Sequence, residues 1–212
     1  MSYKKRFIEL SLSKNALQFG SFKLKSERIS PFFFNSGVFS DGKSLLEISE
    51  LLAELIEEKK LNFDNLFGPA YKGIPLIASL SSTLEKKYNK SVNIIYDRKG
   101  EKKHGEGGEI VGNFNNGKTL IVDDVITAGT AIKNILKKLS KYNHNSTHLI
   151  VLLDREEKGS SETSASKEIE NEYGLKVLSL INLSDIIEYV GSTKDFNIYK
   201  KDIEEYKEKY GS

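Results

Sequence analysis

The chain of 212 residues contains no cysteine. Disulfide bonds, thiolate nucleophiles and cysteine-ligated metal sites are therefore excluded together. Net charge is also nearly absent, because 32 basic residues offset 30 acidic ones and leave +2. So weak an overall field gives no reason to expect a nucleic acid or a membrane surface as a partner, and any site for an anion has to be local.

Long apolar segments are missing as well. The first twenty residues hold no apolar stretch of the length that a secretion signal needs, and no later segment approaches the length of a membrane span. No internal repeat or low-complexity linker divides the sequence. We therefore expect a cytoplasmic protein with one domain over residues 1–212, because a chain of this length buries roughly 70% of its unfolded surface in a sizeable core.

Apolar runs alternate with helix-period segments from residue 61 onward. We expect strands at 63–67, 92–96, 119–124, 147–154 and 175–183. Apolar residues at helical spacing predict helices near 8–16, 45–56, 76–87 and 132–139. This order is typical of an α/β fold in which helices cover a parallel sheet.

Two short extended segments, 22–26 and 31–37, stand apart from this alternation. They predict a small N-terminal hood over approximately residues 1–42, with the sheet and its helices over approximately 43–212. The last residues, 204–212, are expected to form a solvated terminal helix with a fraying end.

Polar, chemically dense segments follow directly after four of the expected strands. They are 68–73, 97–108, 123–130 and 154–155. In open parallel sheets, ligands bind outside the carboxyl ends of the strands. These four segments are therefore expected to converge on one edge of the sheet.

Residues 112–119, GNFNNGKT, match the G-x-x-x-x-G-K-[ST] phosphate loop of ATPases. That loop needs a strand before it and a helix after it, since the phosphates lie on amides at the helix N-terminus. Here Thr119 leads into an expected strand instead. We therefore interpret Asn-Asn-Gly at 115–117 as a turn into that strand.

The stretch LIVDDVITAGTAI, residues 120–132, places two adjacent acids and a turn of small residues after an apolar run. The turn would put backbone amides, two threonine hydroxyls and a helix N-terminus where a phosphate can lie, and Gly129 lets the backbone approach closely. Asp123 and Asp124 beside it are suited to accept hydrogen bonds from sugar hydroxyls. We interpret the stretch as a cradle for ribose 5-phosphate. The alternative, acids that only cap the next helix, leaves the pairing of the acids unexplained.

The same stretch resembles the phosphoribosyl diphosphate (PRPP) signature of type I phosphoribosyltransferases. The segments FFFNSG, FGPAYKGIP, DRKGEKKHGEGG and VLLDR are similar, in the same order, to segments of the orotate phosphoribosyltransferase family. The resemblance covers almost the whole chain. It implies the type I phosphoribosyltransferase fold and transfer of the 5-phosphoribosyl group from PRPP to orotate, giving orotidine 5′-monophosphate and diphosphate in pyrimidine (UMP) biosynthesis.

The resemblance also implies which residues bind PRPP. They are Lys25, Tyr71, Lys72, Arg98, Lys99, Lys102, His104, Asp123, Asp124, Val125, Ile126, Thr127, Ala128, Gly129, Thr130 and Ala131. Four of these, namely Lys102, His104, Asp123 and Asp124, are expected by the same resemblance to have catalytic roles. Lys103 stands where many relatives carry an acid, so the sequence leaves open whether Lys102 or Lys103 dominates. A cis peptide bond is expected from Ala70 to Tyr71, as the family often has one there.

The Gly-rich segment 98–112 is expected to be a mobile loop without regular structure. By resemblance it closes over PRPP, and Lys102 and His104 reach the diphosphate leaving group. The family has its site at a dimer interface across which part of this basic cluster is donated, so a homodimer with a shared active site is implied. The alternative is a basic patch for nucleic acid, but glutamates interleave with the lysines and aromatic stacking partners are missing.

For orotate, the resemblance implies binding by Phe33, Phe34, Thr127 and Arg155. The two rings would stack on the base, and Arg155 would pair with its carboxylate. Each has an alternative interpretation, since neighbouring strand residues point to opposite faces and a single arginine can form a surface salt bridge.

Magnesium is expected on the oxygens of PRPP and diphosphate, without a dedicated protein metal site, because Mg²⁺ prefers water and phosphate ligands. Two related classes would share the acids and the turn. A purine or uracil phosphoribosyltransferase should lack the combination of Phe33, Phe34 and Arg155. A PRPP-sensing transcription regulator would need a DNA-binding module, and no basic helix-turn-helix is apparent in the sequence.

Overall fold

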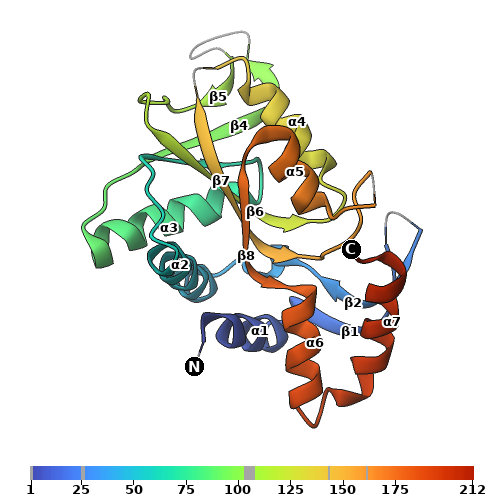
Figure 1. The fold of residues 1–212 in the computed structure, drawn as a ribbon. Helices are drawn as coiled ribbons and strands as arrows, with labels where there is room; N and C mark the ends of the chain where they lie inside the picture. Colours follow the sequence, from blue (N-terminus) through green and yellow to red (C-terminus); the bar gives the residue numbers. More distant parts are fainter. Residues whose placement is uncertain (1, 25–26, 103–107, 143, 161) are drawn as a thin grey trace.

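The computed structural model describes residues 2–24, 27–102, 108–142, 144–160 and 162–212, apart from the side chains of Lys99, Glu101 and Lys102. Its centre is a six-stranded sheet with the order β5-β4-β3-β6-β7-β8 (Figure 1). The strand bounds are β3 Asn65–Gly68, β4 Asn93–Lys102, β5 Gly108–Val111, β6 Lys118–Ile126, β7 Asn145–Asp154 and β8 Lys176–Asn182. The pairs are parallel except β4 with β5, which is antiparallel. The predicted α/β class with a mostly parallel sheet is confirmed.

Helices cover both faces of this sheet (Figure 1). Their bounds are α2 Gly42–Glu58 and α3 Gly73–Tyr88 on one face, and α4 Thr130–Leu139 and α5 Ala165–Tyr173 on the other. Strand side chains alternate between the two cores, as a pleated strand requires. In β6, Leu120 and Val122 join the core beneath α2 and α3, whereas Ile121 joins the core beneath α4 and α5.

A second layer, the hairpin layer, lies against one end of the sheet (Figure 1). Its members are the antiparallel strands β1 Leu17–Lys23 and β2 Ile29–Phe34 with the helices α1 Tyr3–Ser13, α6 Leu183–Ser192 and α7 Lys200–Tyr210. Two short 3₁₀ helices complete it, η1 Ser36–Val38 and η2 Asn197–Tyr199. Figure 1 shows the red α7 beside the blue β2, so both ends of the chain build this layer.

The expectation of an irregular loop over 98–112 was wrong for the two arms of that segment. β4 continues to Lys102, and its residue Asp97 pairs with Ile110 of β5. Cross-strand pairing overrides the low strand propensity of the glycines here, because tertiary context decides strand formation more than the residue type does. Residues 103–107 between the arms lie outside the described part of the chain.

Two helices, α5 and α6, were not anticipated from the sequence pattern. The expected strand 175–183 ends at Asn182, whose side chain accepts a hydrogen bond from the Asp185 amide at 2.8 Å. The Asp185 carboxylate accepts in turn from the Asn182 amide at 2.9 Å, which completes a capping box and starts α6.

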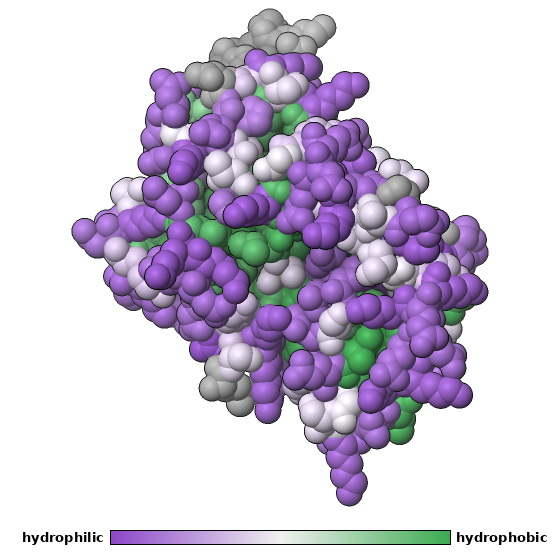
Figure 2. Space-filling model, viewed as in Figure 1, coloured by the Kyte–Doolittle hydropathy of each residue, from purple (hydrophilic) through white to green (hydrophobic). Residues whose placement is uncertain are grey.

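Within the described residues, the structure contains no helix that is long and apolar enough to cross a membrane. Figure 2 shows one face covered mostly by hydrophilic residues, with hydrophobic residues near its middle, over the central sheet.

Candidate active site

The two adjacent acids lie near the carboxyl end of the central strand β6. Asp123 is buried, with 9% of its surface exposed, and its Oδ1 accepts a hydrogen bond from the Asp124 amide at 2.8 Å. Burial, and next the charge of Asp124, raise the pKa of Asp123 to about 7. Desolvation penalises the charged form, so this carboxylate is stabilised when a cation comes near it.

Asp124 joins three segments that are far apart in the sequence. Its Oδ2 accepts hydrogen bonds from Lys72 Nζ at 2.8 Å and from the Ser36 hydroxyl at 2.5 Å. Lys72 lies in the loop after β3, and Ser36 opens η1 directly after β2. The hairpin layer and the loop 69–72 therefore meet at the predicted acids.

The turn after β6 is open to a ligand. Residues 127, 128, 130 and 131 are exposed, and no side chain among the described residues caps the N-terminus of α4. Gly129 has φ +75°, and a side chain there would contact Ala165 and Ile169 at 3.4 Å. The amides of an uncapped helix N-terminus favour an anion, so this turn is suited to a phosphate.

The predicted cis peptide bond between Ala70 and Tyr71 is present. It lies in a tight loop between β3 and α3, where a Cβ added to Gly68 would come within 2.5 Å of the Gly73 carbonyl oxygen. The N-terminus of α3 has no side-chain cap among the described residues, and Tyr71 is 64% exposed. A second open helix N-terminus thus faces the same edge of the sheet.

Arg155 follows β7 and is only 4% exposed. Its Nε donates to Glu157 Oε1 at 2.6 Å and its Nη2 to the Ser30 hydroxyl at 3.1 Å, while Cζ lies 4.1 Å from the centre of the Phe32 ring. Its amide donates to the carbonyl of Ile126 at 3.3 Å, which places the arginine beside the turn after β6. The alternative of a surface salt bridge is therefore wrong.

The two predicted base-stacking residues lie on opposite faces of β2. Phe34 is buried against Phe7 and Phe39, at ring-centre distances of 6.2 and 6.3 Å. Phe33 is 37% exposed and stacks on Phe22 at 5.5 Å. Strand alternation separates the two rings, so they cannot stack together on one base.

A model of the phosphoribosyl transferase domain matches residues 38–178. The orotate phosphoribosyltransferase of Mannheimia succiniciproducens is 41% identical over 210 residues, covering 99% of this chain and 98% of the relative. That of Marinobacter nauticus is 44% identical over 209 residues, with the same coverage.

The chain belongs to the orotate phosphoribosyltransferase family. A crystal structure of the Francisella tularensis orotate phosphoribosyltransferase is similar over 98% of this chain and 100% of that one, with a TM-score of 0.87 and 41% identity. The coverage includes the hairpin layer, so the likeness extends beyond the matched domain. The predicted resemblance and type I phosphoribosyltransferase fold are confirmed.

Several predicted site residues lie outside the part of the chain that the structure describes. Lys25 and His104 are not among the described residues, and neither are the side chains of Lys99 and Lys102. Arg98 is described, and its carbonyl accepts a hydrogen bond from Lys138 Nζ at 3.2 Å. The ligand contacts of these residues remain predictions.

Asp97 is a site residue that the sequence interpretation missed. It is 8% exposed, and its carboxylate accepts from the Ala70 amide at 2.7 Å and from Lys138 Nζ at 2.6 Å. It therefore fixes the cis-peptide loop to β4 and α4. Its signal was an acid at a strand end directly before the predicted basic residues Arg98 and Lys99.

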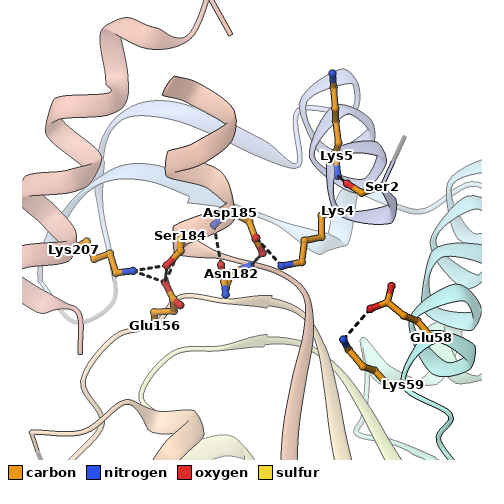
Figure 3. Close-up of polar contacts among 10 residues, drawn as sticks. All are labelled: Ser2, Lys4, Lys5, Glu58, Lys59, Glu156, Asn182, Ser184, Asp185 and Lys207. Atoms are coloured by element: carbon orange, nitrogen blue, oxygen red, sulfur yellow. Dashed lines mark hydrogen bonds and ion pairs between the residues drawn. The ribbon is translucent and has the colours of Figure 1, made fainter. Parts of the chain in front are cut away.

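The C-terminal helix supports the segment after β7, contrary to its expected role as a solvated end. Glu156 accepts hydrogen bonds from the Ser184 amide and from Lys207 Nζ, both at 2.9 Å (Figure 3). Ile203 and Tyr206 of α7 are buried. One face of α7 thus belongs to the core, because its side chains reach residues about fifty positions earlier.

The donor set at the acids fits a magnesium ion carried by a substrate. Within the described residues, no group of three or more His, Cys, Asp or Glu could hold a metal ion. Asp123 and Asp124 still offer two neighbouring carboxylates. Mg²⁺ is commonly bound through one or two carboxylates together with substrate phosphates and water.

Proposed function

We propose that this protein transfers the 5-phosphoribosyl group of PRPP to orotate, giving orotidine 5′-monophosphate and diphosphate in pyrimidine biosynthesis. One observation carries the proposal: the acids of β6 and the turn after it lie beside the buried Arg155, which follows β7, and the Arg155 amide donates a hydrogen bond to the Ile126 carbonyl. A turn suited to a phosphate and a guanidinium suited to a carboxylate therefore lie at adjacent strand ends, which supports the proposal.

PRPP would bind across the ends of β3 and β6. The amides and hydroxyls of residues 127–131 would hold its 5-phosphate, since this helix N-terminus is exposed and uncapped within the described residues. Asp123 and Asp124 would accept from the ribose hydroxyls. Lys72, which pairs with Asp124 in this structure, would contact the diphosphate together with Arg98 and the exposed Tyr71.

Orotate would bind between this turn and the hairpin layer. Its carboxylate would pair with Arg155, because charge-assisted bonds from a guanidinium to a carboxylate are strong and directional. Thr127, exposed at the end of β6, would donate or accept at the ring, and Phe33 would contribute an aromatic surface from β2.

In the reaction, the bond between the anomeric carbon and diphosphate would break, and a ring nitrogen of orotate would supply the electron pair of the new bond while its proton leaves with the diphosphate. Positive charge develops on the ribose, next to Asp123 and Asp124. Lys72, Arg98, Lys102 and His104 would stabilise the departing anion, which is the electrostatic contribution that fixed charges make to a transition state. Magnesium on the substrate oxygens would neutralise part of the diphosphate charge.

By resemblance, we also propose a cytoplasmic homodimer that shares its active sites. Light scattering of the purified chain should give twice the chain mass. A monomer with full activity would rule out a site completed across the interface.

The direct test is a spectrophotometric assay of orotate consumption. Orotate absorbance should fall only when PRPP and Mg²⁺ are both present. Uracil, adenine and guanine serve as alternative bases and should leave PRPP unconsumed, and ATP should not be hydrolysed. Turnover of a purine or uracil without orotate turnover would contradict the proposal.

Lys102 should contribute mainly to the transition state. Replacing it by alanine is expected to lower turnover by about 10² to 10³, on the order of 3 to 4 kcal/mol, if it acts as other preorganised donors do. Initial rates at saturating substrates measure this effect, and the same measurement on Lys103→Ala shows which of the two lysines dominates. Unchanged turnover in Lys102→Ala would exclude the role.

A further inference from the structure

Arg155 is held by a buried network that connects it to the C-terminal helix. Glu157 is 3% exposed, and its Oε1 accepts both from Arg155 Nε at 2.6 Å and from the Tyr206 hydroxyl at 2.8 Å. Tyr206 in turn accepts from Arg155 Nη2 at 3.4 Å. Three side chains therefore form a closed ring of hydrogen bonds between the end of β7 and α7.

The remaining contacts of Arg155 leave one edge of its guanidinium for a ligand. Ser30 accepts from Nη2 at 3.1 Å, and Phe32 covers one face of the group. No described residue forms a hydrogen bond to Nη1. Among the described residues, the only buried polar side-chain atoms without a hydrogen-bond partner are Arg6 Nε and Ser11 Oγ. Nη1 of Arg155 has no such partner and is not one of these atoms. It therefore belongs to the small part of this side chain that solvent reaches.

The charges of this network favour an anion. Glu157 Oε2 also accepts from Arg28 Nη1 at 3.4 Å, so two guanidinium groups share one carboxylate. Burial, and next the charge of Glu157, raise the pKa of Tyr206, which keeps its hydroxyl protonated and able to donate. The network therefore carries surplus positive charge where a carboxylate-bearing base would lie.

We propose that Glu157 and Tyr206 are positioning residues for base recognition: together they orient the Arg155 guanidinium so that its Nη1 edge receives the substrate carboxylate. α7 is thereby part of the apparatus that selects a base bearing a carboxylate. The inference rests on the proposed function, because it concerns the same arginine. Preorganisation of a donor during folding reduces the ordering cost at binding, so loosening the network should weaken orotate binding specifically.

The experiment compares Tyr206→Phe and Glu157→Gln with the wild-type chain. Tyr206→Phe removes one hydroxyl and keeps the ring that packs on Phe32, and should raise KM for orotate by about fivefold to twentyfold. Glu157→Gln replaces the charge-assisted acceptor of Arg155 Nε by a neutral one, which holds the guanidinium less firmly, and should raise KM for orotate as well. KM for PRPP and the inhibition constant of uracil, which has no carboxylate, should stay within twofold.

Tyr210→Phe is the matched control. It makes the same change on the same helix, and none of the described contacts joins its hydroxyl to Arg155 or Glu157. A rise in KM for orotate in Tyr210→Phe equal to that in Tyr206→Phe would indicate a general effect on α7 and overturn the proposal. Equal loss of orotate, uracil and PRPP binding in either test variant would overturn it as well.

Failure of this inference and failure of the proposed function are distinguishable. A wild-type chain that consumes no orotate with PRPP refutes the function. An active wild-type chain with unchanged orotate KM in both Tyr206→Phe and Glu157→Gln refutes only the positioning role. Melting temperatures identify a variant that does not fold, and the other variant then decides the outcome.

Discussion

The turn after β6 exposes four of its five residues between 127 and 131, whereas the segment after β7 buries both Arg155 and Glu157. The first leaves the N-terminus of α4 without a side-chain cap within the described chain. In the second, Arg155 donates a hydrogen bond to Ser30 of β2, and Glu157 accepts one from Tyr206 of α7. Two loops at adjacent strand ends are therefore built in opposite ways.

The difference follows from what each loop would bind. A phosphate carries its own charge and several acceptor oxygens, so exposed main-chain amides suffice to bind it. Before the phosphate binds, water can accept hydrogen bonds from these amides. A carboxylate on a flat base offers fewer contacts, so discrimination needs a fixed guanidinium. A buried guanidinium must be neutralised by the protein itself, which explains Glu157 beside Arg155.

The largest effect is expected from removing the fixed cation. Arg155→Ala should raise KM for orotate by at least about 100-fold, roughly 3 kcal/mol, because truncating one member of a buried charged pair costs about 2 to 5 kcal/mol. PRPP binding, measured by calorimetry, should survive. Lys158→Ala in the same segment is the control. Equal loss of orotate and PRPP binding in Arg155→Ala would make the arginine structural and remove the contrast between the loops.

The open loop is tested by constraining its glycine. Gly129→Val places a branched side chain at φ +75° and into contact with Ala165 and Ile169, and should weaken PRPP binding by about tenfold to fiftyfold because strained backbone costs about 1 to 3 kcal/mol. Gly174→Val is a matched control, since Gly174 has φ +67° at the end of α5 with no atom near its Cβ position. The same PRPP loss in both variants would mean that only stability changed.

The smallest effect concerns stability and pH. The raised pKa of Asp123 means that the folded chain holds a proton that the unfolded chain releases above its ordinary value of 3.8. This contribution to stability is present below pH 4 and is lost as the pH rises through about 7. Asn at position 123 cannot ionise, so Asp123→Asn avoids this loss, and the ligand-free variant should be more stable than wild type by about 1 to 3 kcal/mol at pH 8 and by less at pH 5. Urea denaturation at both values measures this, and a difference independent of pH would contradict it.

Much of the site could be predicted from contiguous residues. The β6 acids, the following turn and the start of α4 at Thr130 lie within one short stretch, and strand-to-helix order determines their arrangement. Arg155 was also identified, through the resemblance of the segment VLLDR to the family. The conflict at Phe33 and Phe34 arose because the resemblance assigned both rings to one ligand while strand alternation separates them.

The missed residues share a different property. Asp97 contacts Ala70 and Lys138, and Tyr206 contacts Arg155 over 51 positions. Neither has a local pattern that distinguishes it from an ordinary strand-end acid or helix tyrosine. Their roles depend on which elements pack together, and the sequence of α7 in particular predicts only a solvated end.

The sequence by itself determined the alternation of strands and helices, the edge where the polar loops gather and the pair of acids before an anion-binding turn. Periodicity and turn chemistry act over a few neighbouring residues, so one chain displays them directly. Only the tertiary structure decided that Arg155 is buried, that Ser30, 125 residues earlier, and α7 hold it, and that Ser36 reaches Asp124. Those contacts form between distant parts of the chain because burial of both strand faces and of one face of α7 brings them together.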